Sequence, residues 1–246
     1  GSVGPAFDGR IKPDVCIEGW EGTSYASPKA AGMMAQLYQV WKQNHNGADP
    51  QSGLIKAFML TTADDLYNPG PDFRTGFGRI NAWRAYNGIN GNQFFVDSLG
   101  NGATKQHTLT VPANVKEVRA MLYWTDYEAT VNAAKALVND LNFSVTTPSN
   151  ATFLPWKLNL FPHADSLDNP ATRGVDSLNN VEQITIPNPA AGNYTLTVNG
   201  HLVPQGPQKY WIVYEFIYDE LTLTYPIGKE AFVAGESEII RWDNYG

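Results

Sequence analysis

Hydrophobic residues recur along this chain at two different spacings, and the change falls near residue 92. Before that point they return every three to four residues, which predicts helices over about 24–41, 50–62 and 83–87. The first of these is rich in alanine and apolar on most of its faces, so we expect it to be buried. Its Gly32 is expected to serve the close approach of another backbone.

After residue 92 apolar and polar positions alternate, which is typical of strands. Strands are predicted at 106–111, 117–124, 140–146, 181–186, 193–199 and 209–217, with Pro, Gly and Asn turns between them. Because no helical pattern interrupts these strands, an antiparallel sandwich is expected. Residues 221–242 have the pattern of the opening strands of a further β module.

Composition and charge narrow the classes of function. The chain has 246 residues, with 17 Lys and Arg against 24 Asp and Glu, a formal charge of −7. We therefore expect no nucleic-acid partner, because binding to phosphates needs a basic face. The single Cys16 rules out an internal disulfide, and no apolar run is long enough to predict a membrane span. The start at Gly1-Ser2 without Met predicts that the chain is a piece of a longer polypeptide.

The most informative stretch is Gly22-Thr23-Ser24-Tyr25-Ala26-Ser27-Pro28, which opens the first predicted helix. A serine at a helix start has its hydroxyl and backbone N–H at the positive end of the helix dipole, where an oxyanion is stabilised during acyl transfer. Gly22 permits the close approach of a substrate backbone, and Pro28 suits a first helical turn. Taken alone, Thr23 or Ser24 is as well explained as a helix N-cap.

This stretch, continued by Lys29-Ala30-Ala31-Gly32, closely resembles the serine-nucleophile signature of the subtilisin-like proteases. The segments Ser2-Val3-Gly4-Pro5 and Lys12-Pro13-Asp14 resemble the family's segment before the nucleophile, and Gly76-Phe77-Gly78 resembles its closing segment. The resemblance runs from residue 2 to about 87. It implies that Ser24 is the nucleophile, that Gly22 and Thr23 lie beside the substrate and the oxyanion, and that no cofactor is required for the chemistry.

Two departures from the family pattern limit what this chain can do alone. Only residues 15–21 separate Asp14 from Gly22, where the family has some twenty more, through a deletion or an omitted loop. The family places its catalytic Asp and His before the serine, whereas His45, His107, His163 and His201 all follow Ser24 and are expected to be surface or packing residues. Since a serine without a general base is a poor nucleophile, we expect the isolated chain to be inactive.

Residues 92–219 resemble the jelly-roll domain that follows the catalytic domain in some bacterial subtilases. The pieces that match include Leu137-Val138-Asn139-Asp140-Leu141 and Pro189-Ala190-Ala191-Gly192-Asn193-Tyr194. In the family such domains add stability and sometimes hold calcium, which takes six to eight oxygen ligands. The oxygen-bearing candidates for a structural calcium here are Asp126, Asn139, Asp140, Asp176 and Glu182, although turn-capping explains each of them equally well.

We therefore expect an incomplete α/β subtilisin-like portion (1–91), an all-β antiparallel jelly-roll or sandwich domain (92–219) and the start of a truncated immunoglobulin-like β module (220–246). The resemblance implies a secreted or cell-surface bacterial serine endopeptidase that acts on proteins or peptides. Its partner would be the remaining N-terminal part of the catalytic domain. The alternative is a noncatalytic binding or adhesion module with a degenerate protease remnant. We further expect residues 24–60 to need cover from elsewhere, and residues 92–219 to fold independently.

Overall fold

The computed structural model describes residues 3–17, 22–161, 163–219 and 221–244. Ser2 of the first motif segment and residues 18–21, which precede the Gly22 motif, lie outside this part. In the described part, the helices before the first strand are α1 (Thr23–Asn44), α2 (Ser52–Thr61) and α3 (Ala82–Asn90). The three predicted helices are therefore confirmed, although α1 and α3 each continue three residues beyond the expected end. A short helix α4 (Ala164–Leu167) lies in a later loop.

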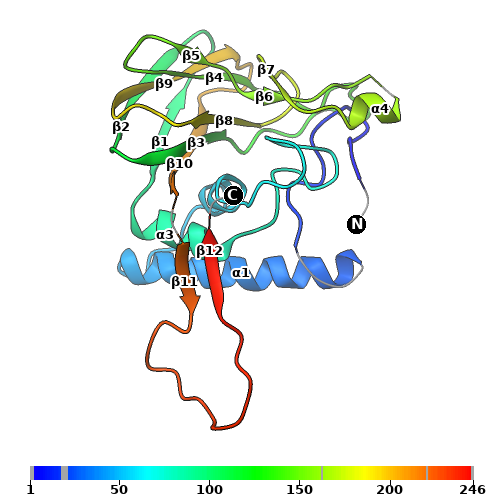
Figure 1. Ribbon diagram of the computed structural model, residues 1–246. Coiled ribbons are helices and arrows are strands. Elements are labelled where there is room, and N and C mark those ends of the chain that lie inside the picture. Colours follow the sequence, from blue (N-terminus) through cyan, green and yellow to red (C-terminus); the bar gives the residue numbers. More distant parts are fainter. Residues whose placement is uncertain (1–2, 18–21, 162, 220, 245–246) are drawn as a thin grey trace.

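Two four-stranded antiparallel sheets form the larger part of the molecule (Figure 1). One sheet has the order β1 (Phe94–Leu99), β10 (Gln208–Tyr218), β3 (Val115–Tyr123) and β8 (Val181–Pro187). The other has the order β2 (Thr104–Val111), β9 (Gly192–Leu202), β4 (Asp140–Thr146) and β5 (Thr152–Phe153). Strands β6 (Trp156–Lys157) and β7 (Thr172–Arg173) pair separately. All six predicted strands are present.

Strand β1 was not among the predicted strands. It pairs with β10 from Phe94 opposite Val213 to Leu99 opposite Gln208. Its burial does not alternate cleanly, since of its six residues only Leu99 is buried. The apolar run Phe94-Phe95-Val96 is a strand signal, but the polar residues that follow it break the period of two.

One hydrophobic core fills the space between the two sheets. Its residues come from both inner faces, and Trp124, Tyr194 and Tyr210 are the largest fully buried side chains in it. Trp124 donates from its indole N–H to the backbone carbonyl of Asn139 at 3.0 Å, and Tyr194 donates to the carbonyl of Ala190 at 2.9 Å. The polar ends of these rings are therefore satisfied while their bodies are removed from water.

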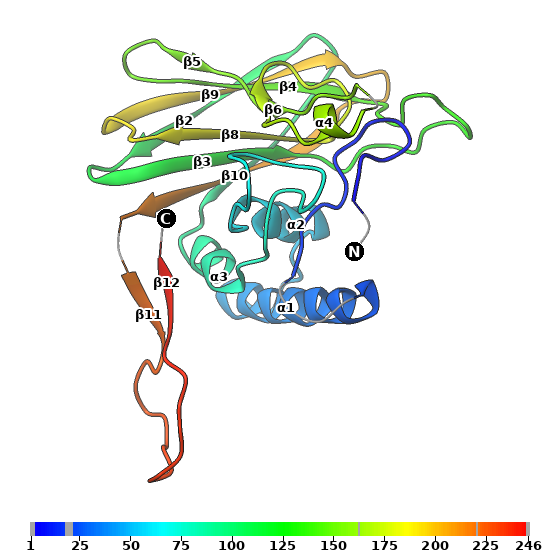
Figure 2. The same ribbon diagram turned by 45° about the vertical axis from the view of Figure 1, so that its right-hand side comes forward.

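A second core lies on the outer face of the sheet β1-β10-β3-β8, where helix α2 packs against β3 and β10. Figure 2 shows α2 between the sheets and α1. Phe58 of α2 is fully buried, and Met121 and Trp211 face it from the two strands. A Cβ on Gly53 would collide with the ring of Trp211, so the helix and the strand approach as closely as glycine allows. Strands β3 and β10 are thus covered on both faces.

This shared core joins the β region to the helices, and the expectation that residues 92–219 fold independently stays a prediction. Two arginines, the buried Arg119 and the half-buried Arg84, strengthen the junction. Arg119 of β3 donates to the carbonyls of Thr61 and Ala63 at the end of α2. Arg84 of α3 makes a two-pronged contact with Glu215 of β10, at 2.6 and 2.9 Å. Because a buried carboxylate or carbonyl without its partner is costly, these contacts tie the helices to the sheet.

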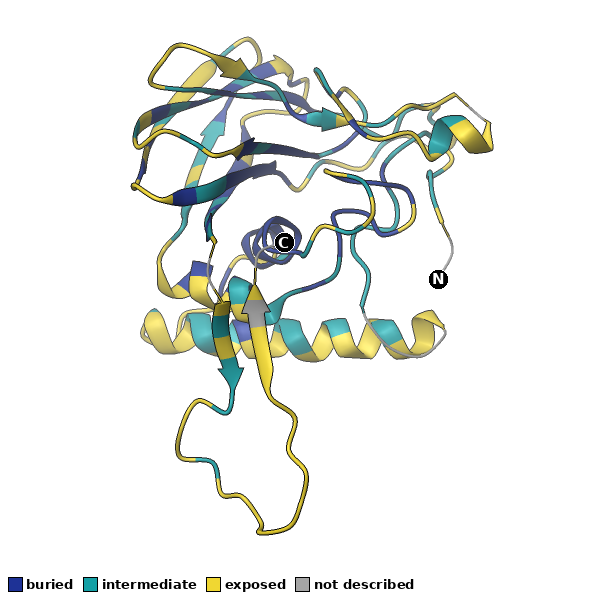
Figure 3. Ribbon diagram, in the orientation of Figure 1, coloured by how far each residue is buried: buried dark blue, intermediate teal, exposed yellow. Residues whose placement is uncertain are grey.

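Helix α1 is exposed along most of its length, which corrects the expectation of a buried helix. In the described chain Leu37 is its only buried residue. No described atom lies within 4 Å of a Cβ built on Gly32, so the expected close approach to another backbone is not made here. Figure 3 shows the contrast between the largely exposed α1 and the buried α2. Of the two helices within residues 24–60, only α1 is left exposed for another part of the protein to cover, because α2 is already buried.

The last described segment is a hairpin of β11 (Leu221–Tyr225) and β12 (Arg241–Asn244) that projects away from the sandwich (Figure 1). Large apolar side chains on it are exposed, among them Ile227, Phe232 and Trp242. A two-stranded hairpin is at best marginally stable by itself in water. The immunoglobulin-like module expected at residues 220–246 stays a prediction.

One histidine of the sandwich gives the fold a testable pH dependence. His107 of β2 stacks on Phe95, and its Nε2 lies 2.9 Å from the hydroxyl of Tyr210. Burial lowers the pKa of His107 below its ordinary value of 6.5. The folded state therefore favours the neutral ring, while the unfolded chain takes up a proton as the pH falls through 6.5. Stability should fall as the pH drops below about 6.5 and level off below the lowered folded pKa.

In a His107→Gln variant we expect this part of the pH dependence to disappear. The free energy of urea unfolding, measured between pH 7.5 and 5, should fall less steeply for the variant than for the unmodified chain. Equal slopes in the two proteins would show that His107 does not carry the effect.

Candidate active site

Ser24 lies in the first turn of α1, as the sequence motif predicts. The helix begins at Thr23, and Gly22 precedes it with φ 110° and ψ 140°, a conformation that side chains rarely adopt. The backbone N–H groups of Tyr25 and Ala26 both point back to the carbonyl of Gly22, at 3.1 and 3.3 Å. Gly22, Thr23 and Ser24 are all exposed. The serine hydroxyl is therefore open to solvent at the positive end of a 22-residue helix.

The structure gives Pro28 a different place from the one expected. It is the sixth residue of α1 and lies beyond the first turn. In an α-helix the N–H of residue 28 would donate to the carbonyl of Ser24, and proline has no N–H to donate. The backbone at the candidate nucleophile thus lacks one regular helical hydrogen bond.

Two segments that resemble the family but lie far apart in sequence, Lys12-Pro13-Asp14 and Gly76-Phe77-Gly78, are adjacent in the structure. Phe77 donates from its backbone N–H to the carbonyl of Asp14 at 2.9 Å, and Cys16 donates to Gly78 at the same distance. A Cβ on Gly76 would collide with the carbonyls of Pro13 and Asp14. Glycine is therefore needed where the Gly-Phe-Gly segment crosses the Lys-Pro-Asp segment. The segment before α1 (residues 12–16) is thereby packed directly against the segment after α2 (residues 76–78).

No described residue supplies Ser24 with a general base. His45 stacks on Trp41 at the far end of α1, roughly 30 Å away at 1.5 Å per helical residue. His107 belongs to the sandwich, His163 immediately precedes α4, and His201 lies on β9. Their places agree with the expectation that they are surface or packing residues.

The five calcium candidates fall into two groups. Three have their side-chain oxygens engaged: Asp126 accepts from Val138 and Asn139 backbone N–H groups, Asn139 accepts from Gln205, and Asp176 accepts from Leu178 and Asn179. These residues hold loops. Asp140 and Glu182 are different, because each keeps one buried oxygen without a hydrogen-bond partner in the described chain. Asn142, which sequence reasoning missed, has a third such oxygen.

The buried carboxyl groups raise one another's pKa values. Burial raises the pKa of Glu182 well above its ordinary value, and the charges of Asp176 and Asp140 raise it further. Burial also raises the pKa of Asp176, although hydrogen bonds from Leu178 and Asn179 oppose this. Among the described residues, no group of three or more His, Cys, Asp or Glu has an arrangement that could hold a metal ion.

Comparison with known proteins supports the resemblance of the first part of the chain. Residues 2–78 match the model of the subtilase family. Two serine protease/ABC transporter B family proteins of Dictyostelium discoideum, tagA and tagB, are 21% and 25% identical over 264 and 304 residues. These alignments cover 86% and 87% of this chain but only 15% and 16% of the relatives. The likeness to subtilisin-like serine proteases is thus confirmed at the level of the family.

Solved structures give only low similarity. The serine protease of Aeromonas sobria is 13% identical, with a TM-score of 0.25, over 79% of this chain and 44% of that one. The pre-peptidase C-terminal domain of Bacillus anthracis collagenase is 15% identical, with a TM-score of 0.29, over 50% of this chain and 87% of that one. Such scores establish no shared fold. None of the helices in the described ranges has the length and hydrophobicity that crossing a membrane requires.

Proposed function

We propose that this chain is the serine-bearing part of a subtilisin-like serine endopeptidase in which Ser24 is the nucleophile. The observation that carries the proposal is an exposed serine in the first turn of α1, within a segment that matches the subtilase family. In the proposed reaction the Ser24 hydroxyl attacks the scissile carbonyl of a protein or peptide. The backbone N–H of Ser24 at the start of the helix stabilises the oxyanion. The peptide C–N bond then breaks, the base passes the proton taken from Ser24 to the leaving amine, and an acyl-enzyme remains.

The general base of this reaction would come from residues upstream of Gly1. No described residue supports Ser24 as a base, and the family order places Asp and His before the serine. We propose the exposed face of α1 around Tyr25, Gly32 and Ala35 as the surface that the upstream part would cover. We propose residues 92–219 as a jelly-roll domain of this enzyme, which the shared core joins to α2. By the same resemblance we propose that the enzyme acts outside the cell or at its surface.

A serine-directed fluorophosphonate probe tests the nucleophile. In the full-length protein we expect the probe to label Ser24, and mass spectrometry of the tryptic peptide identifies the residue. The isolated chain should remain unlabelled, because without a base the hydroxyl is a poor nucleophile. If the full-length protein is not labelled, the second candidate, a noncatalytic binding module built on the sandwich, becomes the better description.

Substitution of Gly32 tests whether another part of the protein covers α1. In the isolated chain Gly32→Ala should stabilise the fold by about 0.5–1 kcal/mol, because alanine favours the helix and no atom opposes its Cβ. In the full-length protein the gain should vanish or reverse if a backbone packs on Gly32. Urea unfolding of both proteins measures the difference. An equal gain in both would mean that nothing packs closely on this position.

A further inference from the structure

Three segments of the chain have the Asn-X-Ser/Thr pattern at which oligosaccharides are attached to secreted proteins. They begin at Asn142, Asn150 and Asn193. A pattern of three residues also arises by chance, so the surroundings of each asparagine in the folded chain decide whether it can carry a sugar chain. An attached oligosaccharide is bulky and hydrated, and it therefore needs an asparagine amide that is exposed and not held by the protein.

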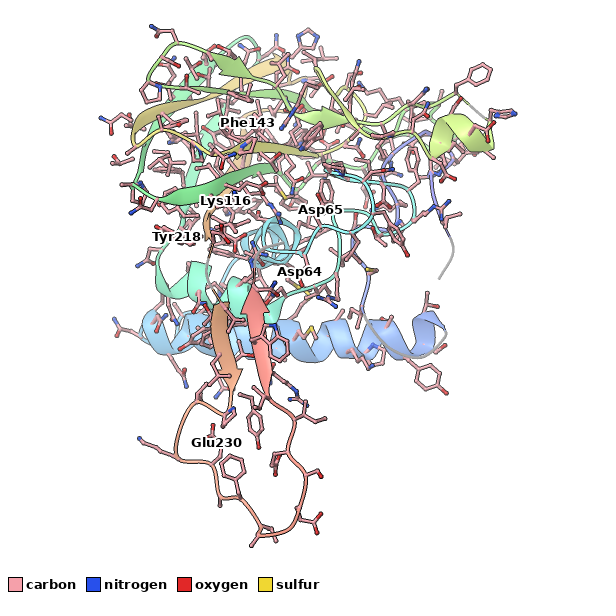
Figure 4. All side chains as sticks on the ribbon, viewed as in Figure 1. Asp64, Asp65, Lys116, Phe143, Tyr218 and Glu230 are labelled. Carbon is pink, nitrogen blue, oxygen red and sulfur yellow. The ribbon has the colours of Figure 1, made fainter. Side chains whose placement is uncertain are left out.

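The segment that begins at Asn142 does not meet this requirement. Asn142 lies in β4 and is paired with β9, and the oxygen of its amide is buried. Phe143, the middle residue of the segment, is 2% exposed and belongs to the core between the sheets, where Figure 4 labels it. A sugar chain on Asn142 would therefore need space that the folded sandwich already fills.

The segment that begins at Asn193 is exposed at the asparagine but held in place. Its Oδ1 accepts a hydrogen bond from the hydroxyl of Thr110 on β2, at 2.9 Å. The next residue, Tyr194, is 1% exposed in the core. To enter the active site of a transferring enzyme, β9 would have to leave β2 and β4, which lie on its two sides, and Tyr194 would have to leave the core.

Asn150 differs from both, because it lies in the turn between β4 and β5. Asn150, Ala151 and Thr152 are all exposed, and the Asn150 side chain makes no hydrogen bond within the described chain. Its φ of 65° is in the left-handed region, which asparagine adopts more readily than most residues. The turn is closed by the backbone N–H of Thr147, which donates to the carbonyl of Ala151 at 2.8 Å. The amide of Asn150 is thus presented to solvent on a defined turn.

The strand that follows Asn150 is also easily displaced. Strand β5 has two residues and lies at the outer edge of its sheet. Only the pairs Val145 with Phe153 and Thr146 with Thr152 join it to β4. Few hydrogen bonds must therefore open for this segment to bend into an enzyme's active site. The hydroxyl that the pattern requires, that of Thr152, lies 3.3 Å from the hydroxyl of Thr146 on the exposed side of this pair.

From these differences we propose that Asn150 is the residue of this chain that carries an N-linked oligosaccharide. The donor is an oligosaccharide on a lipid pyrophosphate. The amide Nδ2 of Asn150 forms a bond to the anomeric carbon of the first sugar, and the bond from that carbon to the pyrophosphate oxygen breaks. The lipid pyrophosphate leaves with the electron pair, and the amide proton passes to a base of the transferring enzyme. The proposal rests on the placement outside the cell proposed above and not on peptidase activity.

The position of Asn150 also gives such a sugar chain a physical role. Figures 1 and 2 place β5 at the end of the molecule opposite α1, so a sugar chain beside β5 leaves the start of α1 open to substrate. Strand β5 itself has one unpaired edge. Uncovered strand edges can pair with the edges of other chains, and a hydrated sugar chain on the adjacent turn shields this one.

Mass spectrometry of the full-length protein tests the site, after secretion from a eukaryotic host behind an added leader peptide. Peptide-N-glycosidase in heavy-oxygen water converts each glycosylated asparagine into a labelled aspartate and so identifies it. We expect the label at Asn150 in most of the folded molecules, at Asn193 in few and at Asn142 in none. An unlabelled Asn150 would overturn the proposal. So would a label at Asn142 as frequent as at Asn150, since the folded surroundings would then not select the site.

Variants of the turn give the matched comparison. Thr152→Ala should remove the sugar chain while Asn150 and its φ stay as they are, whereas Thr152→Ser should keep it, because serine also supplies the hydroxyl. Ser149→Ala is the control, since it removes an exposed hydroxyl of the same turn that is not part of the pattern. An unchanged sugar content in Thr152→Ala would contradict the proposal. Circular dichroism checks the fold of each variant, and the readout is independent of whether Ser24 is a nucleophile.

Discussion

A Ser24→Ala variant of the full-length protein is expected to hydrolyse peptides about 10⁶-fold more slowly, the order of loss seen when the nucleophile of subtilisin is removed. Without the hydroxyl at the start of α1, no acyl-enzyme can form. The residual rate would come from the oxyanion-binding N–H groups and substrate binding. Steady-state hydrolysis of a labelled peptide measures the change, which should appear in kcat.

Ser52→Ala provides the matched control for this variant. Ser52 is also exposed and also lies in the first turn of a helix, but it belongs to α2 and to no family motif. Its substitution should leave kcat unchanged within about twofold. If Ser24→Ala retains full activity, Ser24 is not the nucleophile. The chain of residues 1–246 should show no activity in the same assay, with or without the substitution.

A Phe58→Ala variant is expected to lose about 3–5 kcal/mol of stability, because a fully buried phenyl ring is replaced by a cavity. Phe58 lies in the core that α2 shares with β3 and β10. The loss should therefore destabilise the helices and the sandwich together. Urea unfolding followed by circular dichroism and by tryptophan fluorescence should give coincident transitions, both shifted to lower urea.

Phe7→Ala is the control, because Phe7 is fully exposed in a loop. It should change the free energy of unfolding by no more than about 0.5 kcal/mol. Two separate transitions, with only the first shifted by Phe58→Ala, would contradict the shared core. They would support the expectation that residues 92–219 fold independently.

The start of α1 and the strands of the sandwich could be read from the sequence because their signals are local. The motif from Gly22 to Ser24 places a glycine and a serine at a helix start, and only neighbouring residues decide that geometry, whereas Pro28 lies beyond the first turn where it was expected. Likewise the period of two along strands such as β2 and β9 reflects one buried face and one exposed face.

The places where sequence reasoning failed depend on contacts between distant segments. The nearly continuous burial of β3 arises because α2 covers its second face, and the sequence alone gave no indication of that partner. The exposure of α1 was missed for the same reason, since an alanine-rich apolar helix has the same pattern whether or not another layer covers it.

The sequence by itself determined the identity of the candidate nucleophile, its position at a helix start and the antiparallel character of the β region, because each depends on residue type and short-range spacing. Only the tertiary structure decided which oxygens of the acidic residues are free. Asp126 and Asp176 are engaged by backbone N–H groups, whereas Asp140 and Glu182 each keep one buried oxygen without a partner in the described chain. Hydrogen bonding is a property of three-dimensional neighbours, so the same residue types support loops in one place and keep a buried oxygen unpaired in another.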